Sequence, residues 1–224
     1  MNYPKLSLVV DYDEYWDEKR AKSFGKISDF QRRRLNVVKS FLEKGKSIKD
    51  IGCGEGSFLL NLMDQVSFQK VYGVDVSKKA LKFISQKDVE VIEAQVMSPD
   101  VRCNLPTTDY SILLELLEHT VEPEQVLMDI LLNTKEKVIF SVPNTGYLAH
   151  RLRLLFGSFP LQWRKNPSEH LRFWTLRDMK WWLNELNLKD KSEIRLYEGI
   201  PILNMLFPAV FSAGIVVCVN VANS

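Results

Sequence analysis

Three glycines occur at alternate positions between an apolar run and the start of a helix-like run. The segment reads Asp50-Ile51-Gly52-Cys53-Gly54-Glu55-Gly56. Glycine allows a backbone to turn tightly and to approach a ligand closely. A helix that begins behind such a turn offers free N–H groups and a partial positive charge. The segment therefore predicts a binding site for the negatively charged end of a small ligand.

A carboxylate, Asp75, lies near the end of the next apolar run, which covers Lys70–Val76. Its distance from Gly54 along the chain suits one strand–helix–strand unit, in which such an acid accepts hydrogen bonds from two ribose hydroxyls. The glycine spacing is GxGxG, whereas nicotinamide and flavin enzymes use GxGxxG, and Glu55 would lie unfavourably close to a pyrophosphate. The pattern favours S-adenosylmethionine (SAM). A nicotinamide oxidoreductase and a glycine-rich turn without a cofactor are the alternatives.

Four further side chains could transfer protons or bind a metal. Glu115, Glu118 and His119 follow the apolar run Tyr110–Leu114, and His170 lies much later in the chain. Ligands of open α/β sheets bind outside the carboxyl ends of the strands. We therefore expect these four side chains to converge beside the methyl-donating end of the cofactor pocket.

Three hypotheses account for this group. In the first, His119 or His170 is a general base, and the expected catalytic residues are Glu118, His119 and His170. In the second, Glu115 joins these three residues to bind Mg²⁺, Mn²⁺ or Zn²⁺, with a position open for substrate. In the third, the pair Glu118–His119 only forms local hydrogen bonds after the strand. We expect no metal, and the four-ligand set is the alternative.

The glycine-rich segment resembles motif I of class I SAM-dependent methyltransferases, and further motifs extend the similarity over nearly the whole chain. They are Tyr12-Asp-Glu-Tyr-Trp16, Glu115-Leu-Leu-Glu118-His119-Thr-Val-Glu-Pro123, Ile139-Phe-Ser-Val-Pro-Asn144 and His170-Leu-Arg-Phe-Trp-Thr175. The resemblance implies an enzyme that moves a methyl group from SAM to an oxygen or nitrogen of a small acceptor. The cofactor-binding residues expected are Asp50, Gly52, Cys53, Gly54, Gly56, Asp75, Val76, Gln95 and Glu115.

One of these positions departs from the family pattern. Family members usually have an aspartate near the adenine amino group, where this chain has Ala94-Gln95-Val96. The Gln95 amide can accept a hydrogen bond from adenine N6 and donate one to N1. We therefore expect Gln95 to contact the adenine.

Two branches of the superfamily suggest other functions. MetW-like proteins act with homoserine acyltransferases in methionine synthesis, so a partner without catalytic activity is one alternative. The segment Glu115–His119 argues against a close MetW assignment. Together with His170 it is similar to metal-dependent methyltransferases of small-RNA 3′ ends and of ubiquinone synthesis. The RNA enzymes hold their metal with two glutamates and two histidines, so 2′-O-methylation of RNA ends is the other alternative.

The segment after Pro143 is rich in basic and aromatic residues. Six basic residues and one acid, Glu169, lie between Pro143 and Arg177: Arg151, Arg153, Arg164, Lys165, Arg172 and Arg177. This excess favours an acceptor that carries phosphate or carboxylate. The alternative is a solvated helix face on which arginine stems pack against aromatic rings. No RNA-binding motif accompanies it, so nucleic acid is not an expected partner.

Apolar runs alternate with helix-like runs along most of the chain, which predicts a Rossmann-like α/β fold. We expect a mostly parallel seven-stranded sheet with helices on both faces. The strands expected are Ser47–Ile51, Lys70–Val76, Val89–Ala94, Tyr110–Leu114, Val138–Val142, Glu193–Tyr197 and Ile215–Val221. The helices expected are Gly56–Gln65, Lys78–Ser85, Pro123–Leu132 and Leu176–Leu186, the last capped by Thr175. The chain is expected to be a single domain over 1–224.

Two segments flank this pattern. Residues 1–45 are expected to form a helical lead-in, with a helix that Asp29 caps and Gly45 ends. Residues 144–175 are expected to form an insertion that covers the substrate as a lid.

Composition sets the remaining expectations. The chain has 224 residues, 46% of them hydrophobic, and a net charge of +2 that implies no polyanionic partner. Three widely spaced cysteines and a start unlike a signal peptide favour the cytoplasm. The stretch Gly199–Ser224 has no charged residue and is long enough to span a bilayer. Because Pro201 and Pro208 interrupt it, we expect a loop and a buried strand rather than membrane contact.

Overall fold

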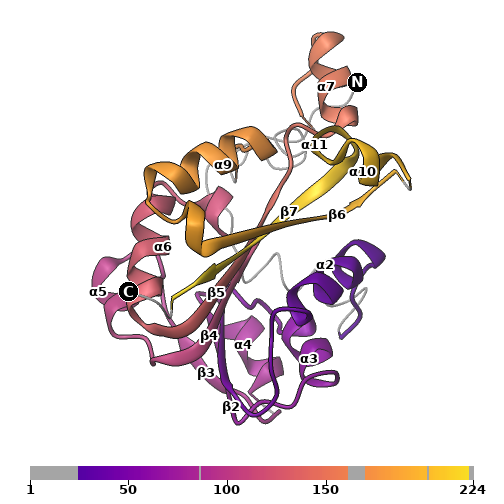
Figure 1. Ribbon diagram of the computed structural model, residues 1–224. Helices are drawn as coiled ribbons and strands as arrows, with labels where there is room; N and C mark the ends of the chain where they lie inside the picture. Colours follow the sequence, from indigo (N-terminus) through magenta and orange to yellow (C-terminus); the bar gives the residue numbers. More distant parts are fainter. Residues whose placement is uncertain (1–24, 86, 161–169, 201, 222–224) are drawn as a thin grey trace.

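The computed structural model describes residues 25–85, 87–160, 170–200 and 202–221. In these residues a seven-stranded sheet lies between two layers of helices (Figure 1). The strands are β1 (Ser47–Ile51), β2 (Lys70–Asp75), β3 (Glu90–Glu93), β4 (Thr108–Leu114), β5 (Thr134–Pro143), β6 (Ser192–Gly199) and β7 (Ser212–Asn220). The helices are α2 (Asp29–Lys39), α3 (Ser57–Met63), α4 (Lys78–Ile84), α5 (Pro99–Cys103), α6 (Pro123–Leu132), α7 (Leu148–Leu155), α9 (Leu176–Glu185), α10 (Leu203–Leu206) and α11 (Pro208–Phe211). The predicted Rossmann-like fold class is confirmed.

The sheet is mostly parallel, as expected, but it is mixed, because β7 runs antiparallel to its neighbours. Its strand order is β3-β2-β1-β4-β5-β7-β6. Neighbours among β1 to β5 pair in parallel, whereas β7 pairs antiparallel with both β5 and β6. The connection from β6 to β7 contains only the one-turn helices α10 and α11, so the chain turns back on itself instead of making a parallel crossover.

This topology gathers several chain segments at one edge of the sheet. Pro143, at the end of β5, pairs with Gly214 near the start of β7, and Gly199, at the end of β6, pairs with Ser212. The carboxyl ends of β1, β2 and β4 lie at the same edge, because these strands run parallel to β5. Connections that are distant in sequence therefore surround one region.

Each face of the sheet has its own apolar core. On one face, α2, α3 and α4 contribute Leu35, Leu59 and Ile84, which are fully buried. On the other face, α6 and α9 contribute Ile130 and Leu183, of which 0% and 1% is exposed. Figure 1 shows α2, α3 and α4 on one side of the sheet and α5, α6 and α9 on the other. Both layers are needed because the central strands are buried on both sides.

The helix of the lead-in begins and ends elsewhere than expected. Ser28, and not Asp29, is its N-cap: the Ser28 hydroxyl accepts from the Gln31 N–H, and the Gln31 side chain accepts from the Ser28 N–H. This reciprocal pair satisfies two backbone groups of the first turn. The helix ends at Lys39, while Gly45 (φ +77°) makes the turn into β1. Residues 1–24 of the lead-in lie outside the described residues.

The insertion and the C-terminal stretch match the expectations in part. The insertion contains α7, which was not predicted, and its residues 161–169 lie outside the described part of the chain. Thr175 caps α9 as expected, in a capping box with Asp178. The C-terminal stretch forms the buried strand β7, as expected, but the expected loop before it contains the one-turn helices α10 and α11. Among the described helices, none has the length and hydropathy that a membrane crossing requires.

Candidate active site

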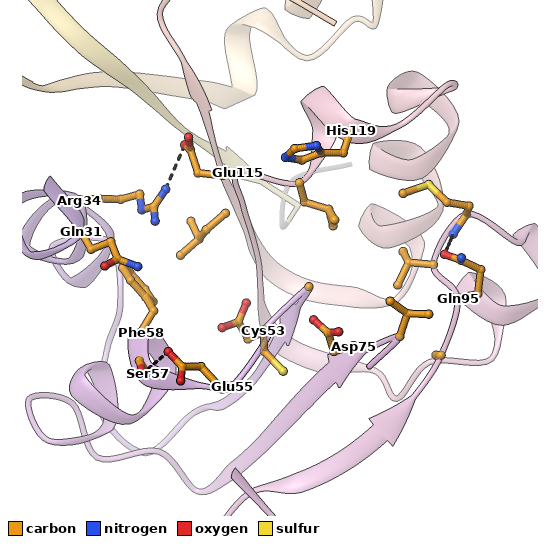
Figure 2. Close-up of a pocket in the computed structure, with 18 of the residues that line it drawn as sticks. Gln31, Arg34, Cys53, Glu55, Ser57, Phe58, Asp75, Gln95, Glu115 and His119 are labelled. Atoms are coloured by element: carbon orange, nitrogen blue, oxygen red, sulfur yellow. Dashed lines mark hydrogen bonds and ion pairs between the residues drawn. The ribbon is translucent and has the colours of Figure 1, made fainter. Parts of the chain in front are cut away.

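A pocket of about 540 Å³ opens at the carboxyl ends of β1, β2 and β4 (Figure 2). Its wall contains seven of the nine expected cofactor-binding residues: Asp50, Gly52, Cys53, Asp75, Val76, Gln95 and Glu115. His119 and His170 lie in the same wall. Gly54 and Gly56 lie behind it, and each has a structural part in shaping the pocket.

The glycine-rich loop uses its own N–H groups internally. Gly52 and Cys53 both donate to the Val74 carbonyl, at 2.8 and 3.1 Å, and Gly56 donates to the Cys53 carbonyl. Gly54 donates to Asp75 Oδ2 at 2.7 Å. The N–H groups of Gly52, Cys53 and Gly54 therefore hold the loop against β2, and that of Gly56 closes a turn within the loop. The expectation that the free N–H groups at the start of the following helix, α3, receive the ligand's carboxylate stays a prediction.

Gly56 is required for packing rather than for ligand approach. Its φ is +78°, and a Cβ there would lie 2.1 Å from Ile84 Cδ1 of α4. Gly52 also has φ +78°, and its Cβ would meet Leu116 Cδ1 at 3.1 Å. A side chain at Gly56 would displace α4, so this glycine sets the distance between α3 and α4.

Two buried acids form the floor of the pocket. Asp75 is 8% exposed and accepts from the Gly54 N–H through Oδ2 and from the Ser77 N–H through Oδ1, at 2.9 Å. Asp50 is 3% exposed. Burial, reinforced by the negative charge of Asp75, raises the pKa of Asp50 to about 7. A cationic ligand group would relieve the repulsion between these acids.

Glu115 takes part in a network of polar side chains that the sequence patterns did not reveal. Its Oε1 pairs with Arg34 Nη1 at 3.0 Å (Figure 2). The same oxygen accepts from Ser141 Oγ at 2.8 Å and from Tyr197 Oη at 3.4 Å. Glu115 itself has φ +54°. Arg34 is only 6% exposed because α2 packs on the sheet. The residues around an arginine in a helix do not predict that it will be buried. Gln31, also of α2, lines the same pocket.

Glu118, His119 and His170 come together. Potential ligand atoms of these three residues lie within 4.8 Å of one another, and the two imidazole centroids are 4.7 Å apart. The N–H groups of Leu171 and Arg172 donate to the Glu118 carbonyl, at 2.8 and 3.1 Å, which ties the His170 segment to the short helix η1 (Leu117–His119).

The pKa values of Glu118 and His170 are shifted from their ordinary values. Glu118 is 1% exposed, and neither carboxylate oxygen has a hydrogen-bond partner among the described residues. Burial, with the nearby charge of Glu115, raises the pKa of Glu118 well above its ordinary value. Burial and then His119 lower the pKa of His170 to about 4. His170 is therefore neutral at pH 7, the form in which an imidazole accepts a proton or binds a metal.

The basic residues of the insertion that the structure describes do not line the pocket. Arg151 donates to the Gly146 carbonyl, Arg153 to the Phe159 carbonyl and Arg172 to the Val121 carbonyl. Arg164 and Lys165 lie outside the described residues. Within the described wall, the guanidinium is that of Arg34, and its Nε has no partner there.

The strand order and the glycine-rich turn between β1 and α3 define the class I SAM-dependent methyltransferase fold. The methyltransferase domain of a bacterial Hen1 superposes with a TM-score of 0.59 and 22% identity over 86% of this chain and 100% of that one. Magnesium protoporphyrin IX methyltransferase from Synechocystis PCC 6803, crystallised with SAH, superposes with a TM-score of 0.59 and 17% identity over 92% of this chain and 94% of that one. These similarities establish the fold.

Residues 32–214 match the family of the methionine biosynthesis protein MetW, and the chain belongs to this family. The bifunctional methionine biosynthesis protein MetXA/MetW of Rhodopirellula baltica is 26% identical over 187 residues. That match covers 71% of this chain and 28% of the relative, so the chain spans little more than a quarter of the relative's length. The expectation that the segment Glu115–His119 separates this chain from MetW is wrong.

Proposed function

We propose that this MetW-family chain is a SAM-dependent methyltransferase that acts on an oxygen or nitrogen of a small acceptor. The observation that carries the proposal is that the expected cofactor-binding residues and the two histidines line the same pocket. Asp75 and Gln95 lie in its wall where a nucleoside would bind, and His119 and His170 lie in the same wall. A cofactor and an acceptor could therefore meet inside it.

The charges of the pocket fit SAM. SAM has positive charges at its sulfonium and ammonium groups and a negative charge at its carboxylate. Asp75 supplies buried negative charge, as Asp50 does when it is ionised, and the guanidinium of Arg34 lies in the pocket wall. Arg34 is the group we assign to the SAM carboxylate, because the four glycine-loop N–H groups described above are already used.

The protein's part in the reaction is positioning and proton transfer. SAM, when bound, supplies an electrophilic methyl group on a positively charged sulfur. The acceptor atom must lie in line with that group, which the shape of the pocket enforces. His119 or His170 would take the acceptor's proton.

Binding and turnover test this proposal separately. Calorimetry should show that SAM and its demethylated product bind and that NAD does not. Transfer of labelled methyl from SAM should then be measured over a panel of hydroxyl- and amine-bearing small molecules, with and without phosphate or carboxylate groups. If neither SAM nor its product binds, the proposal is wrong.

Glu118 favours a metal-assisted version of the same reaction. An ionised carboxylate that is buried without a partner is costly, so such a group is either protonated or bound to a cation. His119 and His170 are the neighbouring ligands, and a set of one carboxylate and two imidazoles leaves positions open for an acceptor. Because Glu115 pairs with Arg34, the candidate set has three ligands and not the four of the alternative considered from the sequence.

Direct metal binding decides between this version and a histidine base. Calorimetry with Mn²⁺ or Zn²⁺ should detect one site in the wild type and lose it in Glu118→Gln, a change that keeps the side chain's shape. Glu115→Gln is the control that should retain the site. If the wild type binds none of these ions, and a chelator leaves methyl transfer unchanged, the histidine base is the remaining assignment.

The family match favours a second function, as a partner protein in methionine biosynthesis. The relative from Rhodopirellula baltica unites MetXA and MetW in one protein. A tagged form of this chain should then copurify with a homoserine acyltransferase from the same cells. Asp75→Ala separates the two functions, because it removes a ligand of the SAM site without changing the surface.

A further inference from the structure

Large apolar side chains are exposed on two connections at the carboxyl edge of the sheet. One group lies on α7 and just beyond it, and the other lies on the connection between β6 and β7. The members are Leu152, Leu154, Leu155, Phe156 and Phe159, then Ile200, Ile202, Leu203, Met205, Leu206 and Phe207, each 36–83% exposed. We call these residues the apolar rim. Exposed apolar groups of this number usually mark an interaction surface.

The two groups belong to one region of the surface. Asn144, which leads into α7, donates through Nδ2 to the carbonyls of Ala209 and Ser212, at 3.2 and 2.7 Å. The Asn144 N–H donates to the Ala213 carbonyl at 2.9 Å. Figure 1 shows α7, α10 and α11 at the same end of the molecule. The rim is therefore held together by the junction of β5 and β7.

The two connections contain basic residues and no acidic ones. Residues 144–160 and 199–221 contain no acid, and their charged residues are Arg151 and Arg153, although 26% of the whole chain is charged. Residues 200–211 include one polar side chain, Asn204. A protein interface usually surrounds its apolar centre with hydrogen-bonding groups, which this segment lacks. The nearest acid along the chain, Glu198, is paired with Arg33. Apolar side chains that have Arg151 and Arg153 beside them match an anionic lipid surface.

We propose that the apolar rim docks on an anionic membrane surface. Leucine, methionine and phenylalanine side chains enter the boundary between headgroups and acyl chains, and the two arginines face the anionic headgroups. The strand β7, which is buried, stays in the sheet, so only residues 200–211 of the uncharged C-terminal stretch take part. The inference is independent of whether the pocket binds SAM.

Vesicle sedimentation tests the proposal on the full chain. Wild-type protein should sediment with phosphatidylcholine vesicles that contain phosphatidylglycerol, bind vesicles of phosphatidylcholine alone more weakly, and dissociate as salt is raised. The variant Met205→Ser/Phe207→Ser should lower binding by about tenfold. Leu132→Ser removes an equally exposed leucine (82%) on α6, outside the rim, and should bind as the wild type does. Circular dichroism verifies that each variant folds.

Two results overturn the proposal. One is that the wild type does not bind the anionic vesicles, and the other is that the rim variant binds them as strongly as the wild type does. If the wild type and the rim variant both fail to bind vesicles, and the wild type captures a homoserine acyltransferase that the variant does not, the rim is a protein interface.

Discussion

The carboxyl group of Asp50 is buried beside a second acid, Asp75, which disfavours its ionised form. Its pKa in the folded protein is about 7, above the value of 3.8 for an ordinary aspartate. The folded state therefore binds a proton that the unfolded state has released. The stability from this proton is complete below about pH 4 and is lost as the pH rises through 7.

We expect Asp50→Asn to remove this pH dependence. Without ligand, the variant should melt at a higher temperature than the wild type at pH 8, because no buried charge forms, and the gain is at most about 3–4 kcal/mol. Thermal melts between pH 5 and 8 measure the difference. Asp64→Asn, at an exposed aspartate, should follow the wild-type curve. Parallel curves for Asp50→Asn and the wild type would show that Asp50 is not the titrating group.

Arg34 links a structural ion pair to the proposed cofactor site. Arg34→Gln should lower SAM affinity about tenfold or more and destabilise the protein by about 1–3 kcal/mol, since Glu115 loses its partner in a partly buried site. Adding Glu115→Gln should restore stability but not SAM binding. Calorimetry and urea unfolding measure the two effects.

The neighbouring residue provides the control. Arg33 pairs with Glu198 at the surface, where the arginine side chain is 57% exposed, so Arg33→Gln should cost less than about 1 kcal/mol. If Arg34→Gln binds SAM as tightly as Arg33→Gln does, the carboxylate of SAM lies elsewhere.

At the scale of elements, the contact between α3 and α4 depends on Gly56. We expect Gly56→Ala to destabilise the protein by about 2–4 kcal/mol, because a Cβ would overlap Ile84 and the backbone has positive φ. Gly45→Ala has the same positive φ with open space around it, and should cost only about 1 kcal/mol. Denaturant unfolding compares the two variants. Equal losses would mean that backbone strain, and not the contact with α4, sets the cost.

At the scale of the whole molecule, ligand binding should raise stability. SAM at a hundredfold excess over its dissociation constant adds about 2.7 kcal/mol, which for a chain of this size corresponds to roughly 5–10 °C in melting temperature. Scanning calorimetry with SAM, its demethylated product and NAD measures this. Asp75→Ala should show a smaller shift with SAM, and an equal shift with NAD would contradict the assigned cofactor.

Local patterns in the sequence determined most of the elements and one half of the pocket. Alternating apolar and amphipathic runs predicted the strands and the main helices, since burial on one or two faces imposes those periods. The glycine-rich turn and Asp75 were found because both lie in one strand–helix–strand unit. In the same way, Glu118 and His119 were expected at the pocket because they follow β4.

Only the tertiary structure decided the rest. The insertion of β7 between β5 and β6 depends on the short connection 200–211, and strand order is a non-local property. Arg34 reaches Glu115 because α2 packs on the sheet. The same packing places Glu115 beside Arg34 and outside the group of Glu118, His119 and His170. His170 was expected beside Glu118 and His119, but the contact that brings it there, the bonding of its segment to η1, appears only in the structure. These partners are distant in sequence, so no local pattern encodes them, and their meeting depends on how the elements pack.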